Sequence, residues 1–366
     1  MTEEKPQQLP QRLISLDFYR GLTMFLLIGS STSLYSLMRN SDVGFVSWIG
    51  FQFRHAPWHG LTLWDLVEAS FMFIVGVAIP FSTMKRLERG ESWKKIFYHV
   101  LQRSALLFFI GIAYYWASAG RPVFRLWNVL TQLSFTYLVA FLLMRKPLKI
   151  QILAAFACLA LTELLYRSWW VPGFDQPFVA DQNFGSWFDL QIMGVLERDH
   201  WVAFNALPTA AFTIWGVVTG LILRSDRTDM QKFKILAVAG LIGILLGVGL
   251  DPITPIVKRV GSSSYVIVSA GICLVLLALS YWIVDMKKVA AIPKFFVIVG
   301  MNPLFIYVFD QFGGTSVLLK IAKPFAYGLL SWTGDVGVDF LKAILGWLML
   351  WYICYWLYHH KILIKL

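Results

Sequence analysis

The chain has 366 residues, of which 58% are hydrophobic and only 14% are charged, and its formal net charge is +11. Together with a mean hydropathy of +0.64, this composition excludes an ordinary soluble enzyme and indicates a membrane protein. The positive charge does not indicate nucleic-acid binding, because the sequence has no basic soluble segment with interleaved aromatic residues to support it.

About ten apolar segments are long enough to be transmembrane α-helices, so the predicted fold is an all-α polytopic bundle. In chain order they span about 16–37, 61–84, 96–116, 126–144, 149–166, 204–223, 233–250, 263–285, 295–312 and 338–357. A polar tail, residues 1–11, comes first and is expected to be cytoplasmic and disordered. Residues 12–366 are expected to form one transmembrane domain, with an extracytoplasmic loop at about 167–203.

The distribution of basic residues predicts the orientation of the bundle. Most lysines and arginines fall in connections that lie on the cytoplasmic side if both termini are cytoplasmic, as the positive-inside rule requires. Lys320 and Lys323, in the predicted connection between the last two helices, depart from this pattern. The first apolar segment has no small-residue cleavage site, so we expect a retained helix rather than a removable signal peptide.

The most informative stretch is RHAPWHGLTLWDLVEASFMFIVG, residues 54–76. His55 and His59 precede a long apolar helix, and Asp65 and Glu68 share one face at its start. A histidine can take and return a proton near neutral pH, and carboxylates in an apolar helix are costly and indicate function. Asp65 is expected to orient the imidazole of His55, which would then act as a general base or as the acyl carrier itself. The alternative is a solvated histidine at the membrane interface.

Two other polar segments are candidate parts of a site. Arg20, with Asp17 at the start of the first helix, is either an interfacial ion pair or an anchor for an anionic ligand. Asn302, Tyr307 and Asp310 interrupt an otherwise apolar helix and suggest a polar cavity. The three cysteines, Cys158, Cys273 and Cys354, lie in separate apolar segments and suggest neither a disulfide framework nor a metal site.

Three separated segments, RLISLDFYRG, RHAPWHGLTLWDLVEASFMFIVG and GMNPLFIY, are together similar to the heparan-α-glucosaminide N-acetyltransferase family and its bacterial NagX-like relatives. Weaker similarity at FNALPTAAFTIWGVVTG and SSSYVIVSAG extends over nearly the whole chain. The resemblance implies a membrane-embedded acyltransferase. It would move an acetyl group from cytoplasmic acetyl-CoA to the amino or hydroxyl group of a glucosamine-type sugar on the periplasmic side of a bacterial inner membrane. Independently of the resemblance, no metal is expected.

The resemblance also implies site residues. The active-site histidine of the family falls on His55, and a functional asparagine of the animal enzyme falls at or near Ser31. The expected partners are coenzyme A, an amino sugar and the lipid bilayer, and a homodimer is left open. A transporter of amino sugars or cell-wall saccharides remains the alternative. The residues expected to bind substrate or coenzyme A are Arg20, Ser31, Arg54, Trp58, His59, Trp64, Glu68, Asn302, Tyr307 and Asp310.

Overall fold

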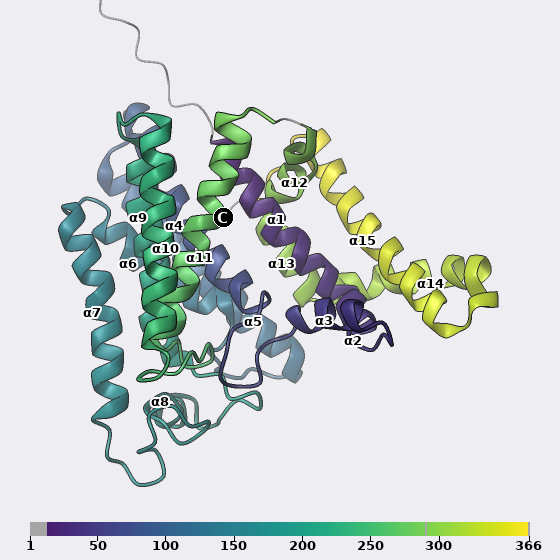
Figure 1. The fold of residues 1–366 in the computed structure, drawn as a ribbon, viewed down its shortest axis with the longest axis horizontal. Helices are drawn as coiled ribbons and strands as arrows, with labels where there is room; N and C mark the ends of the chain where they lie inside the picture. Colours follow the sequence, from purple (N-terminus) through teal and green to yellow (C-terminus); the bar gives the residue numbers. More distant parts are fainter. Residues whose placement is uncertain (1–12, 290, 365–366) are drawn as a thin grey trace, which may run out of the picture.

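A computed structural model describes residues 13–289 and 291–364, and for residues 291–293 it describes the backbone alone. The expected polar tail, residues 1–11, lies outside the described residues. The described part is helical throughout, which confirms the predicted fold class (Figure 1). Its α-helices are α1 (Ile14–Ser31), α2 (Leu34–Arg39), α3 (Gly44–Gln52), α4 (Asp65–Glu88), α5 (Trp93–Ala119), α6 (Val129–Leu143), α7 (Leu148–Arg167), α8 (Phe184–Met193), α9 (Ala206–Arg224), α10 (Asp229–Leu250), α11 (Ser263–Tyr281), α12 (Ala291–Gly300), α13 (Pro303–Gln311), α14 (Gly314–Leu330) and α15 (Asp335–His359).

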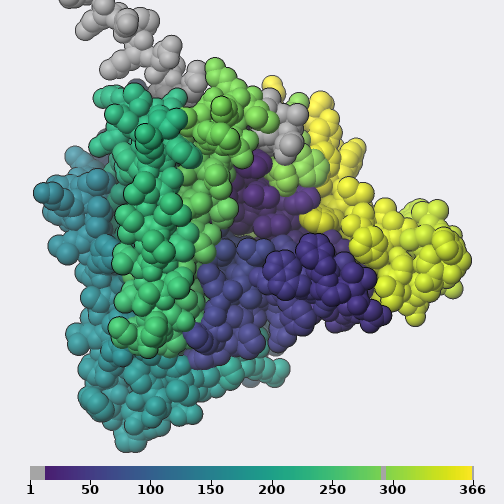
Figure 2. Space-filling model, viewed as in Figure 1, coloured from purple at the N-terminus to yellow at the C-terminus, as the bar shows by residue number. Residues whose placement is uncertain are grey.

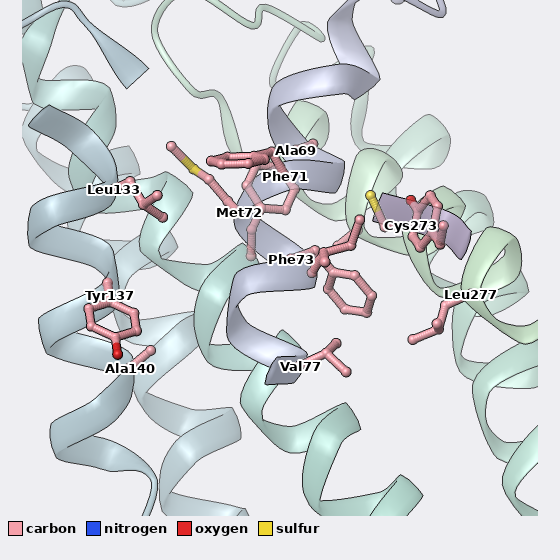
Figure 3. Close-up of a cluster of buried hydrophobic side chains, with 14 of the residues drawn as sticks. Ala69, Phe71, Met72, Phe73, Val77, Leu133, Tyr137, Ala140, Cys273 and Leu277 are labelled. Carbon is pink, nitrogen blue, oxygen red and sulfur yellow. The ribbon is translucent and has the colours of Figure 1, made fainter. Parts of the chain in front are cut away.

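Helix α4 lies at the centre of the bundle. It packs against α1, α6, α9 and α11, and its apolar side chains meet those of α6 and α11 in one buried cluster (Figure 3). Small residues allow α4 and α9 to approach closely: a Cβ added at Gly76 would lie 2.2 Å from the carbonyl oxygen of Thr213. Close packing of this kind fixes the start of α4, which carries Asp65.

One end of the bundle collects the long connections, and we call it the α8 end (Figure 1). It holds α8, the first residues of α4 and α6, and the loops 53–64, 120–128 and 251–262. Side chains tie these segments together: Arg125 donates to the carbonyl oxygen of Met193, and His59 bonds to Asp251 at 2.8 Å. In the predicted topology this is the extracytoplasmic end.

Seven of the described helices are long and apolar enough to cross a membrane, or eight if α13 and α14 together form one bent span. The predicted number of ten and the orientation are therefore not confirmed. Helix α6 is apolar but has only 15 residues. Helix α1 carries the charged pair Asp17 and Arg20 in its first turns, which lowers its hydropathy.

Two predicted helices are broken, and each break is a correction. The predicted helix 16–37 ends at Ser31, because Ser33 adopts a left-handed conformation (φ 65°) and α2 starts after it. The predicted helix 295–312 is divided between α12 and α13 at Asn302 and Pro303. Proline cannot donate the backbone hydrogen bond that a continuous helix needs at this position.

The third correction concerns the predicted connection between the last two spans, residues 313–337. It forms α14, which Gly313 separates from α13 at a positive φ of 85° and which is bent from α13 by 76°. Lys320 and Lys323 lie on this helix and lower its apparent hydropathy. Figure 2 shows α14 and the adjoining part of α15 standing out from one side of the molecule, beyond α2 and α3.

Candidate active site

His55 and Asp65 form a hydrogen-bonded pair at the α8 end. Nδ1 of His55 lies 2.7 Å from Oδ1 of Asp65, whose side chain is only 1% exposed. If Nδ1 donates to the carboxylate, Nε2 carries the free lone pair and can accept a proton. The pair thus has the arrangement of a base and the residue that orients it.

The other carboxylate oxygen of Asp65 organises the loop before α4. Oδ2 accepts hydrogen bonds from the backbone N–H groups of Ala56 (3.2 Å) and Thr62 (3.1 Å) and from Oγ1 of Thr62 (3.0 Å). An anionic side chain at the first residue of a helix also interacts favourably with the helix dipole. Asp65 therefore fixes both the imidazole and the backbone that carries it.

Two distant segments, the loop 251–262 and the loop that contains Phe178, hold the same loop from outside. Arg259 donates to the carbonyl oxygens of Ala56 (2.8 Å) and Pro57, and Gly60 donates to the carbonyl oxygen of Ile256 (2.9 Å). Trp58 donates through Nε1 to the carbonyl oxygen of Phe178 at 2.8 Å. The position of His55 consequently depends on residues up to about 200 positions away in the sequence.

Lys258 is a member of the site that the sequence analysis missed. Its ammonium group is buried 3.4 Å from Glu68 and 3.8 Å from Asp65, and it lies over the ring of Trp201 at 5.3 Å. No motif in the sequence singles out Lys258 as a site residue. Its position in the short apolar stretch PIVKRVG could have indicated that this charge is buried.

The surroundings lower the pKa of His55 below its ordinary value. Burial disfavours the charged imidazolium, and the nearby Lys258 ammonium disfavours it further, while the hydrogen bond to Asp65 opposes both effects. His55 is therefore neutral, and able to accept a proton, over a wider pH range than an exposed histidine.

A cavity of about 370 Å³ opens beside this pair. The imidazole of His55 lies between two indole rings of its wall, 5.2 Å from Trp201 and 6.3 Å from Trp64 between ring centroids. The wall also contains Glu68 and Tyr307, so the structure brings four of the predicted site residues to one cavity, with Asp65 behind His55. Further lining residues come from α1, α4, α5, α13, the start of α6 and the loop after α8, and they include Met24, Leu27, Phe71, Tyr114, Tyr115, Trp127, Asn128, Gln132, Glu197, Asp199 and Gln311.

The remaining predicted residues lie outside this lining. Arg20 pairs with Asp17 and donates to the carbonyl oxygen of Gly300 at 2.7 Å. Ser31 bonds back to the carbonyl oxygen of Leu27 (3.1 Å) in its own helix. Trp58 and His59 hold the loop, as described above, and Arg54 is exposed.

Asn302 is also away from the cavity, and Asp310 is half-buried near the end of α13. The buried amide of Asn302 binds the C-terminal segment, accepting from the N–H of Ile364 at 2.8 Å and donating to the carbonyl oxygen of Ile362 at 3.2 Å. Among the described residues, no group of three or more His, Cys, Asp or Glu side chains is arranged to hold a metal ion.

The connection 120–128 and α8 position another wall of the cavity. The indole Nε1 of Trp127 donates to Asp189 at 2.5 Å, and Asp189 also accepts from the N–H of Ala203 at 3.0 Å. Burial raises the pKa of Asp189 to about 7. Asn128 caps α6 and lies 3.4 Å from the hydroxyl of Tyr307.

These features define a multi-pass membrane protein with a histidine and carboxylate pair beside a partly polar cavity. Residues 12–251, more than half of the chain, match the family described as heparan-alpha-glucosaminide N-acetyltransferase, catalytic. The chain therefore belongs to this family of transferases.

Two relatives support the assignment. Heparan-alpha-glucosaminide N-acetyltransferase of Homo sapiens is 33% identical over 172 residues, which cover 44% of this chain and 23% of the human protein. The enzyme of Mus musculus is 32% identical over 136 residues, which cover 35% of this chain and 18% of the mouse protein. The chain thus matches only about a fifth of the length of each relative.

Proposed function

We propose that this protein is a transmembrane acyltransferase of a bacterial inner membrane. It moves an acetyl group from cytoplasmic acetyl-CoA to the amino group of a glucosamine-type sugar on the periplasmic side. The observation that supports this most directly is the neutral His55, oriented by Asp65 and facing a cavity large enough for a sugar ring. The family match to a glucosaminide N-acetyltransferase is consistent with both the reaction and the acceptor.

In the proposed reaction, His55 acts as a general base. The neutral amine of the acceptor attacks the thioester carbonyl, Nε2 of His55 removes one proton from the attacking nitrogen, and the new C–N bond forms as the C–S bond breaks. The imidazolium then passes this proton to the departing thiolate, which leaves as the thiol of coenzyme A. Asp65 stabilises the transient imidazolium through the hydrogen bond at 2.7 Å.

Lys258 supplies positive charge where the carbonyl oxygen becomes negative. A buried ammonium group in a cavity is worth more to a developing oxyanion than the same group in water, because the surroundings screen it less. Lys258 is 6% exposed and shares the cavity wall with His55, as this role requires. The cavity also extends along Phe71, Met24 and Leu27, an apolar lining that suits a thioester arm.

A direct assay tests the proposal. Purified protein in nanodiscs, with [14C]acetyl-CoA and the methyl glycoside of glucosamine, is expected to form the N-acetyl sugar. His55→Gln is expected to lower the turnover at least 100-fold, because the base is lost. The matched control is His200→Gln, which changes a histidine in an extracytoplasmic loop that does not line the cavity.

Two results would contradict the proposal. The first is transfer by His55→Gln at the wild-type rate. The second is uptake of labelled amino sugar into proteoliposomes without acetyl-CoA, combined with no transfer when acetyl-CoA is added; this would instead identify a transporter.

A further inference from the structure

The wall of the histidine cavity carries more acidic than basic side chains. Three carboxylates, those of Glu68, Glu197 and Asp199, line it, whereas Lys258 is the one lysine or arginine among its lining residues in the described part of the chain. Lys258 is already engaged by Glu68 at 3.4 Å. A ligand that complements the charge of this wall therefore carries positive charge.

Gln132 provides an independent indication of a ligand. It lies one turn inside α6, is only 2% exposed and lines the same cavity. Its Nε2 donates to the carbonyl oxygen of Trp127, whereas its Oε1 has no hydrogen-bond partner in the described part of the protein. A buried amide oxygen without a donor costs free energy, and a hydroxyl or ammonium group of a ligand in the cavity would remove that cost.

The aromatic side chains narrow the chemical class further. The rings of Trp64, Trp127, Trp201 and Tyr115 all line the cavity. Lys258 and Arg259 already lie over the ring of Trp201. The faces of Trp64 and Tyr115 can pack against the C–H groups of a pyranose ring, and an indole face also attracts an ammonium group. Flat apolar faces combined with a few acceptors are suited to a sugar that carries a positive charge.

We propose that this wall is the acceptor subsite and that it selects an amino sugar in its ammonium form. Asp199 and Glu197 hold the charge at the α8 end of the cavity, and Oε1 of Gln132 accepts from a sugar hydroxyl deeper inside. The bound ammonium loses one proton to solvent before it attacks the thioester. Once acetylated, the nitrogen has no charge, so the product binds more weakly than the substrate and leaves. This inference rests on the proposed acetyl transfer.

Binding of small sugars without acetyl-CoA tests the subsite separately from the reaction. The probes are the methyl glycosides of glucosamine, N-acetylglucosamine and glucose, titrated calorimetrically into the full chain in nanodiscs at pH 6.5. The glucosamine probe is expected to bind at least tenfold more tightly than either neutral probe. Asp199→Asn is expected to abolish most of this difference.

Matched variants separate charge from shape. Asp175→Asn removes an acidic side chain of the same loop region that does not line the cavity, and it is expected to bind the probes as the wild type does. Gln132→Met is expected to weaken the binding of the glucosamine and glucose glycosides by similar factors, since it removes a hydrogen-bond acceptor without changing the charge. Unchanged binding of coenzyme A to each variant shows that the fold is intact.

Equal binding of charged and neutral probes would overturn the inference, as would a preference that Asp199→Asn leaves intact. If the wild type prefers the ammonium sugar in an Asp199-dependent manner but transfers no acetyl group, the subsite stands and the proposed function fails. If transfer occurs and no such preference exists, the proposed function stands and the subsite fails.

Discussion

Asp65 holds His55 with one carboxylate oxygen and the loop before α4 with the other. Asparagine keeps the shape of the side chain but removes its charge. If its amide N–H faces Nδ1 of His55, the imidazole changes tautomer. If its carbonyl oxygen faces Nδ1, the hydrogen bond that orients the ring is weaker. Asp65→Asn is therefore expected to lower kcat for acetyl transfer by about 100- to 10,000-fold.

Initial rates at saturating acetyl-CoA measure this effect. The matched control is Asp181→Asn, which removes the carboxylate of another histidine and aspartate pair, the one with His200 at 2.7 Å. It is expected to change kcat less than threefold. An Asp65→Asn enzyme as fast as the control variant would show that the orientation of His55 does not matter for the reaction.

Lys258 sets the protonation of the same histidine. Its charge lowers the pKa of His55, so its removal must favour the imidazolium and raise that pKa. Lys258→Met is expected to move the acid limb of the profile of kcat/KM against pH to higher pH. Lys342→Met, which changes a lysine paired with Asp339 on α15, serves as the control. An acid limb that stays in place in Lys258→Met would mean that His55 does not respond to this charge.

At the scale of the elements, the crossing of α4 and α9 depends on glycine. A Cβ at position 76 would meet the backbone of Thr213 at 2.2 Å, and backbone atoms cannot move aside as a side chain can. Gly76→Ala is expected to destabilise the protein by about 1–3 kcal/mol and to lower its melting temperature. Thermal unfolding of the detergent-solubilised protein measures this change.

Gly249→Ala is the matched control, because it introduces the same methyl group in α10 with no atom within 4 Å. Alanine favours a helix over glycine by up to about 1 kcal/mol, so this variant is expected to be as stable as the wild type or more so. Equal melting temperatures for the Gly76 and Gly249 variants would mean that the two helices can separate at little cost.

Helix α8 joins the bundle through a buried carboxylate whose charge is costly. The pKa of Asp189 in the folded protein is about 7, well above the ordinary aspartate value, so folding favours its protonated form. This group's contribution to stability is fully present below the unfolded pKa of about 4 and is lost as the pH rises to about 7.

Asp189→Asn removes this titration. The melting temperature of the variant, measured relative to that of the wild type, is expected to rise between pH 5 and pH 8. Asp175→Asn, in the exposed loop before α8, is expected to show no such trend. If the difference between Asp189→Asn and the wild type is the same at both pH values, Asp189 is already charged at pH 5.

At the scale of the whole molecule, the orientation in the membrane stays a prediction, and so does the single transmembrane domain of residues 12–366. With both termini inside, position 175 before α8 would face the periplasm, and position 226 between α9 and α10 would face the cytoplasm. In a background lacking the three native cysteines, a membrane-impermeant maleimide is expected to label Asp175→Cys in intact spheroplasts. Asp226→Cys is expected to react only after permeabilisation, and the reverse pattern would invert the topology.

Hydropathy and charge predicted the helical class and most of the long helices, because each of these helices is a continuous apolar segment of the sequence. The same pattern could not predict the breaks at Ser33 and Asn302, which depend on backbone conformation and on Pro303. It also missed α14, because Lys320 and Lys323 reduce the hydropathy of a helix that is otherwise apolar.

The candidate site shows the same division. His55, Asp65 and Glu68 lie within one segment of the sequence, and the structure places them together. Lys258, Gln132 and Asp199 reach the cavity from segments distant in the sequence, so only tertiary packing brings them to His55. Asn302 was predicted from the sequence to belong to the site, but its side chain binds the backbone of the C-terminal segment instead.

The hydrogen bond between His59 and Asp251 joins side chains 192 positions apart in the chain. Neither side chain lines the cavity, so a ligand bound there does not replace their contact with one another. In related proteins, a substitution at one of these positions should leave the other side chain without its hydrogen-bond partner. A second substitution at the other position would relieve this loss. Positions 59 and 251 are therefore expected to diverge as a pair, even between family members whose substrates differ.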